Sequence, residues 1–213
     1  STVSPFVSKS VWMSNGGKEE YNREELAWFG GLDLSARTDL TALILIAEIP
    51  ETKTHVVECY FWTPEIGLLD RAKTDRVAYD LWAADGYLRT TPSATVDYDY
   101  IADDLADIVD GVHIEAIAFD RWRIDIMKAA LERKNLHINL IEYGQGFKDM
   151  APAMDSVEAA LLNNRIRHEM HPVLSMCAAN AVVTKDPAGG RKLDKHKATG
   201  RIDGMVALVM AFG

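Results

Sequence analysis

Residues 114–120 read Ile-Glu-Ala-Ile-Ala-Phe-Asp, a short and almost wholly apolar run that ends in a carboxylate. A strand of a parallel sheet has this pattern when helices cover both of its faces. Helical patterns lie on either side of it, at residues 98–109 and 124–134, and another strand pattern follows at 138–143. This alternation of strands and helices predicts an α/β fold with parallel strands.

A different pattern precedes this alternation. Residues 28–34, 41–49 and 55–62 are rich in β-branched and aromatic residues, and short turns join them. Short turns connect neighbouring strands in antiparallel order. We therefore expect a mixed sheet of five or more strands, in which the first three are antiparallel and helices flank both faces. Among α/β folds this order resembles the ribonuclease H arrangement, although strand order alone leaves other α/β folds open.

The remaining segments complete the predicted domain. Further helices are expected at residues 68–82, 153–163, 172–181 and 202–212, and a hairpin at 182–195. Residues 1–28 lack sustained periodicity, so we interpret them as a linker and place the compact domain at residues 29–213. Every apolar run is shorter than the roughly 18 residues of a membrane helix, so no membrane contact is expected.

Three aspartates occupy positions that this fold could bring together. Asp33 interrupts the first strand, Asp120 ends the fourth strand, and Asp203 opens the final helix. Each has a simpler interpretation: Asp33 as a turn residue, Asp203 as a helix cap, and Asp120 as the ion-pair partner of a nearby arginine. Their convergence favours a metal site instead, because clustered carboxylates repel one another unless cations neutralise them. Asp39 is a weaker candidate, since a turn before the second strand explains it.

Carboxylate oxygens are the ligands that Mg²⁺ and Mn²⁺ prefer. Two such ions about 4 Å apart activate water and stabilise the leaving oxygen in phosphodiester hydrolysis. The aspartates therefore predict a nuclease. The sequence contains no phosphate-binding loop motif of ATPases and no dinucleotide-binding motif, so no nucleotide cofactor is expected.

The distribution of charge bears on the substrate. The chain carries 23 basic and 32 acidic residues, and its net charge of −9 alone argues against a nucleic-acid partner. Residues 165–201, however, hold eight basic and three acidic residues, next to Asp203. The candidate DNA contacts are Arg121, Lys185, Arg191, Lys192, Lys195, Lys197 and Arg201. A solvated hairpin would explain most of them equally well. Trp122 could stack on a base or lie in the core.

Several of these segments resemble the nuclease domain of terminase large subunits from tailed bacteriophages. The resemblance rests on Gly31-Leu32-Asp33-Leu34-Ser35, Asp39-Leu40-Thr41-Ala42-Leu43, Phe119-Asp120-Arg121-Trp122 and Arg201-Ile202-Asp203-Gly204-Met205-Val206-Ala207, in this order, and covers about residues 25–213. It implies a ribonuclease H-like fold. It also implies a metal-dependent endonuclease that cuts concatemeric viral double-stranded DNA at the start and end of genome packaging, with Mg²⁺ or Mn²⁺, two ions in all, held by Asp33, Asp120 and Asp203.

The family's ATPase motor is missing from this sequence, so residues 1–28 would be the remnant of the linker to it, and no ATPase activity is expected from this chain. In the full-length protein the resemblance implies three partners, namely the motor domain, a terminase small subunit and the capsid portal, in the cytoplasm of the host cell. Two alternatives remain open. One is another ribonuclease H-like nuclease, such as a Holliday-junction resolvase, and the other is a non-catalytic docking module for a portal or motor protein.

Overall fold

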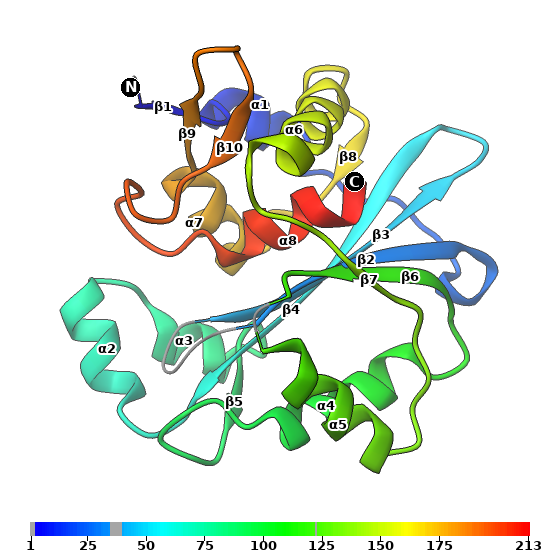
Figure 1. Cartoon of the computed structure of the whole chain (residues 1–213), viewed down its shortest axis with the longest axis vertical. Helices are drawn as coiled ribbons and strands as arrows, with labels where there is room; N and C mark the ends of the chain where they lie inside the picture. The colour runs from blue at the N-terminus through cyan, green and yellow to red at the C-terminus, as the bar shows by residue number, and fades with distance from the viewer. Residues whose placement is uncertain (1–2, 35–39, 122) are drawn as a thin grey trace.

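The computed structural model of the chain describes residues 3–34, 40–121 and 123–213. A seven-stranded mixed sheet crosses its centre, in the order β5-β4-β3-β2-β6-β7, with β8 paired to β4 (Figure 1). The strands are β2 (Ala27–Asp33), β3 (Thr41–Ile49), β4 (Thr54–Pro64), β5 (Arg89–Thr91), β6 (His113–Phe119), β7 (Leu140–Glu142) and β8 (Ile166–Arg167). Helices cover both faces of the sheet, so the predicted fold class is confirmed.

The strand directions follow the predicted order. β2, β3 and β4 are antiparallel neighbours, whereas β6 runs parallel to β2, with Leu32 opposite Phe119. β7 in turn runs parallel to β6. Because Leu32 and Phe119 are paired, Asp33 and Asp120 follow them at the same edge of the sheet.

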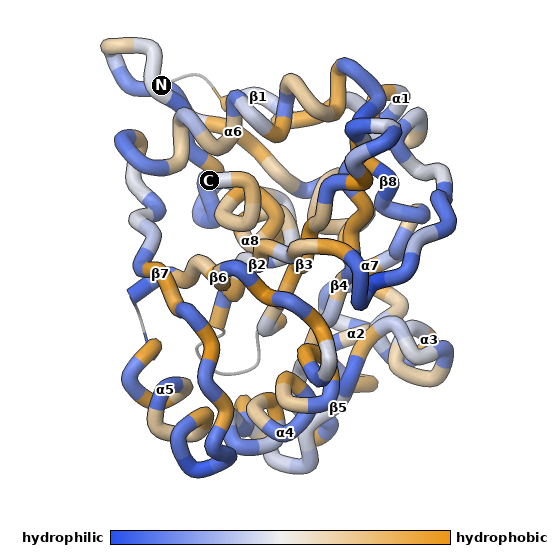
Figure 2. Tube along the Cα trace, turned by 90° about the vertical axis from the view of Figure 1, so that its right-hand side faces the viewer, coloured by the Kyte–Doolittle hydropathy of each residue, from blue (hydrophilic) through white to orange (hydrophobic). Residues whose placement is uncertain are grey.

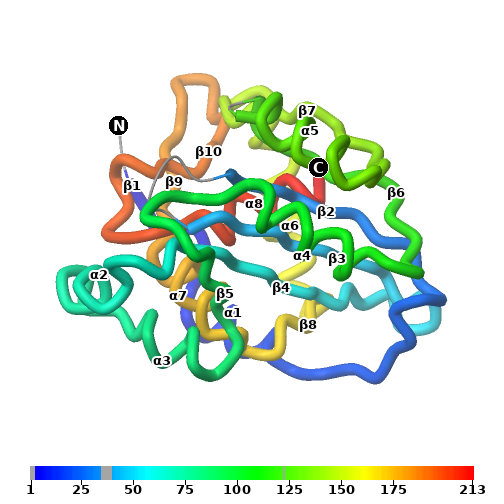
Figure 3. Tube along the Cα trace, turned by 90° about the horizontal axis from the view of Figure 1, so that it is seen from below, coloured from blue at the N-terminus to red at the C-terminus, as the bar shows by residue number. Residues whose placement is uncertain are grey.

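Two helices cover one face. These are α4 (Tyr98–Val109) and α5 (Ile124–Arg133), which lie over the sheet when it is seen from below (Figure 3). Alternate strand residues point to this side, as the two-residue period of a strand requires. Trp28, Leu43 and Trp62 are fully buried there. Asp97 caps α4, because its side chain accepts a hydrogen bond from the backbone N–H of Tyr100.

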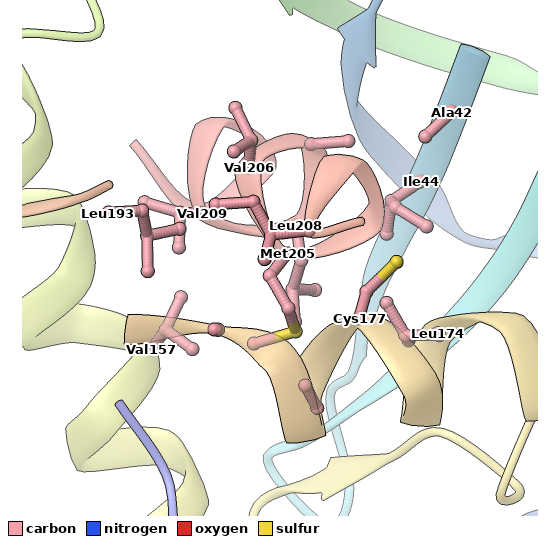
Figure 4. Close-up of a cluster of buried hydrophobic side chains, with 14 of the residues drawn as sticks. Ala42, Ile44, Val157, Leu174, Cys177, Leu193, Met205, Val206, Leu208 and Val209 are labelled. Atoms are coloured by element: carbon pink, nitrogen blue, oxygen red, sulfur yellow. The ribbon is translucent and has the colours of Figure 1, made fainter. Parts of the chain in front are cut away.

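Three helices form the layer on the other face: α6 (Phe147–Leu162), α7 (Pro172–Asn180) and α8 (Asp203–Phe212). α8 is apolar on all sides and is buried along almost its whole length, from Asp203 to Ala211. Its side chains meet those of β3, α6 and α7 (Figure 4). The hydropathy view shows the apolar α8 in the interior and hydrophilic stretches on the outside (Figure 2). Such a helix can be stable only in the core of a larger domain.

Close backbone contact places α8 against the sheet. A Cβ atom at Gly31 would lie 1.8 Å from the carbonyl oxygen of Ala207, so only glycine allows this approach of α8 to β2. Asp33 is the last residue of β2 and Asp203 is the first residue of α8, so both belong to the two elements that are in contact here.

A second, three-stranded antiparallel sheet stands apart from the first. It joins β1 (Val3–Pro5), β9 (Val182–Lys185) and β10 (Arg191–Leu193), and the last two form the predicted hairpin. After β1 and before β2 the chain forms α1 (Lys9–Ser14). Its Trp12 is buried and stacks on His168, with 3.9 Å between the ring centres. A 3₁₀ turn, η1 (Arg23–Glu25), precedes β2. The interpretation of residues 1–28 as a linker to another domain stays a prediction.

Some helix bounds differ from the predicted ones. The predicted helix at residues 68–82 is two helices, α2 (Leu68–Asp75) and α3 (Tyr79–Ala84), because Arg76 adopts the left-handed conformation, with φ of 55°, and ends α2. α6 begins six residues earlier than expected and carries Pro152 inside it. Within the described residues, no helix combines the length and the apolar content that a bilayer crossing needs.

Candidate active site

Two of the three predicted aspartates meet at the contact between β2 and α8. Asp33 is the last residue of β2 and is 3% exposed, and Asp203 is the first residue of α8 and is 8% exposed. A carboxylate in the first turn of a helix is favoured by the unpaired backbone N–H groups there. Burial of two carboxylates nevertheless carries a large desolvation cost unless a cation accompanies them.

Lys195 supplies a cation. Its ammonium group donates a hydrogen bond to Asp33 Oδ2 at 2.8 Å and contacts Asp203 Oδ1 at 3.4 Å. Burial by itself would lower the pKa of Lys195, but the carboxylates of Asp33 and Asp203 outweigh burial and raise this pKa above its usual range. Lys195 therefore stays charged, and one positive charge is shared by two negative ones.

Asp120 follows the strand that is paired with β2, and it is less buried than Asp33 and Asp203. It directly follows β6 and is partly buried, and it takes part in an interaction of its own. In the portion of the chain that the structure describes, no three acidic, histidine or cysteine side chains are grouped closely enough to hold a metal ion. Asp33 and Asp203 thus come together around Lys195, and the role of Asp120 as a third ligand stays a prediction. Asp39 and Trp122 lie outside the described residues.

The thiol of Cys177 lies near the two aspartates and is neutral. Cys177 on α7 is fully buried, and burial raises the pKa of its thiol, with a further contribution from the nearby carboxylate of Asp203. The side chain packs in the cluster between α7, α8 and β3 (Figure 4). A thiol in such surroundings serves as an apolar packing group and is unreactive.

Several of the predicted DNA contacts are engaged with side chains of the protein itself. Arg191 forms ion pairs with Asp155 and Glu158 of α6, and Lys192 lies over the ring of Phe147, 5.0 Å from its centre. These contacts fasten the hairpin of β9 and β10 to α6. The predicted DNA contact of Lys195 stays a prediction, and Lys195 contacts Asp33, 162 positions away in the sequence. Nothing in the local sequence distinguishes Lys195 from its neighbours, so this role was missed.

The other candidate basic residues lie on the surface or in a cleft. Lys185 and Lys197 are exposed, and Arg121 is exposed beside Glu142, at 3.6 Å. Arg201 lies 3.9 Å from Asp75, in a polar cleft of about 700 Å³ between the α2–α3 region and the loop before α8. Gly200 and Arg201, shortly before Asp203 in the sequence, line this cleft.

The donor set has the chemistry of a divalent cation site. Two buried carboxylate oxygens lie within 3.4 Å of one ammonium group, so the position between them already holds positive charge. Mg²⁺ and Mn²⁺ prefer oxygen ligands of this kind. Asp33 and Asp203 therefore fit such a cation, provided that Lys195 moves away.

The chain is similar to proteins of a known family over its whole length. The model of a family described as "Terminase large subunit, endonuclease domain" matches residues 23–213. The large terminase subunit of Enterobacteria phage HK97 is 54% identical over all 213 residues, which span 42% of its length. The crystal structure of that HK97 protein has a TM-score of 0.93 at 53% identity and covers 99% of this chain, which in turn covers 43% of it.

More distant structures share the fold. The large terminase nuclease of the thermophilic phage G20c has a TM-score of 0.58 at 10% identity, with 95% of this chain and 97% of that chain covered. A structure of the same nuclease with bound magnesium has a TM-score of 0.56 at 9% identity and covers 95% of each chain. The fold is therefore the ribonuclease H-like fold of these nucleases.

Proposed function

The chain belongs to the family of terminase large subunit endonuclease domains, and we propose on this basis that it is a divalent-metal-dependent nuclease that cuts double-stranded DNA. The observation that carries the proposal is the pair of buried aspartates, Asp33 and Asp203, which share a single positive charge. Two buried carboxylates with one ammonium between them keep a net negative charge, and this charge attracts a cation.

Each candidate residue has a role in this proposal. Asp33 and Asp203 hold the cations, and Asp120, which follows the strand paired to β2, completes the ligand set. Bound Mg²⁺ or Mn²⁺, two ions in all, would activate the attacking water and stabilise the leaving oxygen. Burial excludes bulk water from Asp33 and Asp203 and strengthens their electrostatic interactions. The G20c nuclease with bound magnesium has the same fold, which supports this choice of ion.

The basic residues hold the substrate. Lys185, Lys197, Arg121 and Arg201 lie on the exposed surface or in the cleft before α8, where they would contact DNA phosphates. Phosphate contacts bind without regard to base sequence, so we expect weak cutting with little sequence preference.

The wider role follows from the family and from the length of the relatives. In a full-length terminase of the HK97 type, of which this chain spans about two fifths, the domain would cut concatemeric viral DNA when packaging begins and ends. It would work there with an ATPase motor domain, a small subunit and the capsid portal, in the cytoplasm of the host cell. No ATPase activity is expected from residues 1–213 themselves.

Plasmid cleavage tests the enzymatic part of the proposal. Supercoiled plasmid should be nicked and linearised with Mn²⁺ or Mg²⁺ and left intact with EDTA. Asp33→Asn and Asp203→Asn should slow cutting by more than about 100-fold, since even groups that only support a metal ligand are worth 10- to 100-fold. Asp120→Asn tests the third ligand in the same way.

Asp107→Asn is the matched control, because Asp107 is an exposed aspartate on α4. It should cut at the wild-type rate. Cutting by Asp33→Asn at the wild-type rate, or intact plasmid at every metal concentration, would contradict the proposal. Four-way junctions cut much faster than linear duplex would indicate a junction resolvase instead.

A further inference from the structure

The position of Lys195 suggests a function beyond substrate binding. Building on the proposed function, we propose that Lys195 is a positioning residue, an internal counter-ion that holds Asp33 and Asp203 together in the metal-free protein and competes with the divalent cation for them. The observation is one ammonium group within 3.4 Å of both carboxylates.

The main chain around Lys195 presents this ammonium in a defined place. Leu193, two residues before it, is buried in the core beside α8. Asp194, directly before it, accepts hydrogen bonds from the backbone N–H groups of His196 and Lys197, at 3.0 and 3.2 Å. Lys195 thus projects from a turn that hydrogen bonds of the neighbouring residues stabilise. The conformation of this loop directs its side chain toward Asp33.

The hairpin behind this turn is anchored as well. Arg191 binds Glu158 of α6 at 2.9 Å, and the backbone N–H of Asp194 donates to the carbonyl oxygen of Val182 at 3.1 Å. The side chain of Lys195 is itself 41% exposed, although its ammonium group touches buried carboxylates. A side chain open to solvent on one side can swing out without unfolding the loop that carries it.

Charge balance explains why the cation would replace the ammonium group. Asp33 and Asp203 carry two negative charges and Lys195 carries one positive charge, so the group keeps one uncompensated negative charge. A divalent cation in the same position would neutralise both carboxylates. The divalent cation would repel the ammonium group of Lys195. This group would then leave the carboxylates for solvent or for a phosphate group. The ammonium therefore lowers the apparent metal affinity by the fraction of time it occupies the site.

Metal affinity of a lysine variant tests this competition. In Lys195→Met a neutral side chain of similar length replaces the ammonium group. Mn²⁺ binding, measured by calorimetry on the full 213-residue chain, should become at least about tenfold tighter, because no internal cation has to be displaced. Without metal, the melting temperature should fall by about 5 °C, since two buried carboxylates then lack a counter-ion.

Lys134→Met is the matched control. Lys134 has an ion pair with Asp103 at 3.0 Å and a side chain of similar exposure, 33%, but it lies at the end of α5 and away from the aspartates. It should keep wild-type Mn²⁺ affinity. A purely structural role for Lys195 predicts a lower melting temperature with unchanged or weaker Mn²⁺ binding in Lys195→Met, and that result would overturn the inference.

A second measurement uses the wild-type protein, in case Lys195→Met does not fold. Acetylation of lysines by a water-soluble ester, followed by mass spectrometry, should show Lys195 protected without metal and labelled once Mn²⁺ is added. Lys134 should be labelled equally in both states. Labelling of Lys195 that does not respond to Mn²⁺ would also overturn the inference.

The proposed function fails in a different way. If neither the wild type nor Lys195→Met binds Mn²⁺, the site is not a metal site at all and both proposals fall. If the wild type binds Mn²⁺ and cuts plasmid while Lys195→Met binds no more tightly, only the role of Lys195 is wrong.

Discussion

At Asp33, burial disfavours the charged carboxylate and the neighbouring charge of Lys195 favours it. A carboxylate that is only 3% exposed loses most of its hydration, and the ammonium group of Lys195 at 2.8 Å compensates for part of that loss. The sequence placed Asp33 and Asp203 together because both lie in apolar stretches at the ends of predicted elements. It could not place Lys195 there, since a loop lysine carries no periodicity, and the contact depends on how the hairpin packs on α6.

His171 carries a pH-dependent part of the stability. It precedes α7, its ring contacts Phe61 and Tyr87, and burial lowers its pKa from 6.5 to about 4. Below pH 6.5 the unfolded chain binds a proton at this position and the folded chain does not, so stability falls as the pH drops from 6.5 towards 4. At pH 5.0 we expect the free energy of unfolding to be about 2 kcal/mol lower because of His171 alone.

Urea unfolding at pH 7.5 and 5.0 measures this effect. In His171→Asn the asparagine can still accept a hydrogen bond at the start of α7 but does not titrate, so the difference between the two pH values should shrink by about that amount. An equal difference in both proteins would show that His171 does not contribute.

At the scale of elements, the contact of α8 with β2 positions the two aspartates. The predicted order of strands and the bounds of α4 agree with the structure. Long periodic segments with a clear capping residue, such as Asp97 before α4, are determined mainly by their local sequence. Shorter elements were missed. β1, β5 and β8 are two or three residues long, and they pair only because the rest of the chain brings a partner strand beside them.

Helix ends were harder to predict than helix positions. The predicted helix at residues 153–163 is part of α6, which starts at Phe147 and includes Pro152. Periodicity does not reveal the left-handed conformation of Arg76 that separates α2 from α3, because that conformation is uncommon for any residue but glycine.

Substitution of Gly31 tests the contact between α8 and β2. Gly31→Ala would place a Cβ atom 1.8 Å from the carbonyl oxygen of Ala207, so backbone has to move. We expect a loss of at least about 2 kcal/mol in the free energy of unfolding. Gly17→Ala is the control, because a Cβ atom there makes only an ordinary van der Waals contact, 3.5 Å from Arg167, and it should change stability by less than about 0.5 kcal/mol. Equal unfolding midpoints for the two variants would mean that α8 does not pack on β2 in this way.

At the scale of the whole molecule, charge is divided unequally. Residues 1–164 carry 15 basic and 28 acidic residues, against eight basic and three acidic residues in 165–201. On the proposed function, the negative part would repel DNA and the positive part would attract it, so we expect DNA contact to concentrate in residues 165–201. The structure narrows this region further, because Arg191 and Lys195 are engaged with acidic side chains of the protein.

DNA binding should therefore depend on the exposed lysines. In Lys185→Gln/Lys197→Gln the plot of log affinity against log salt should become shallower by roughly 0.9 for each phosphate that the protein no longer neutralises, as measured by anisotropy of a labelled duplex with EDTA present. Lys53→Gln, in the turn between β3 and β4, should leave the slope unchanged. The same slope in the double variant as in the wild type would place the DNA elsewhere on the surface.

The burial of α8 also has a consequence for synthesis of the domain. Among the elements that the structure describes, α8 follows all the others, yet it is the helix that fills the space against β2 and supplies Asp203. While residues 203–212 are still inside the ribosome, the sheet is already complete but its face at Gly31 is bare. The nascent domain therefore exposes apolar surface and keeps Asp33 without its partner carboxylate until residues 203–212 emerge.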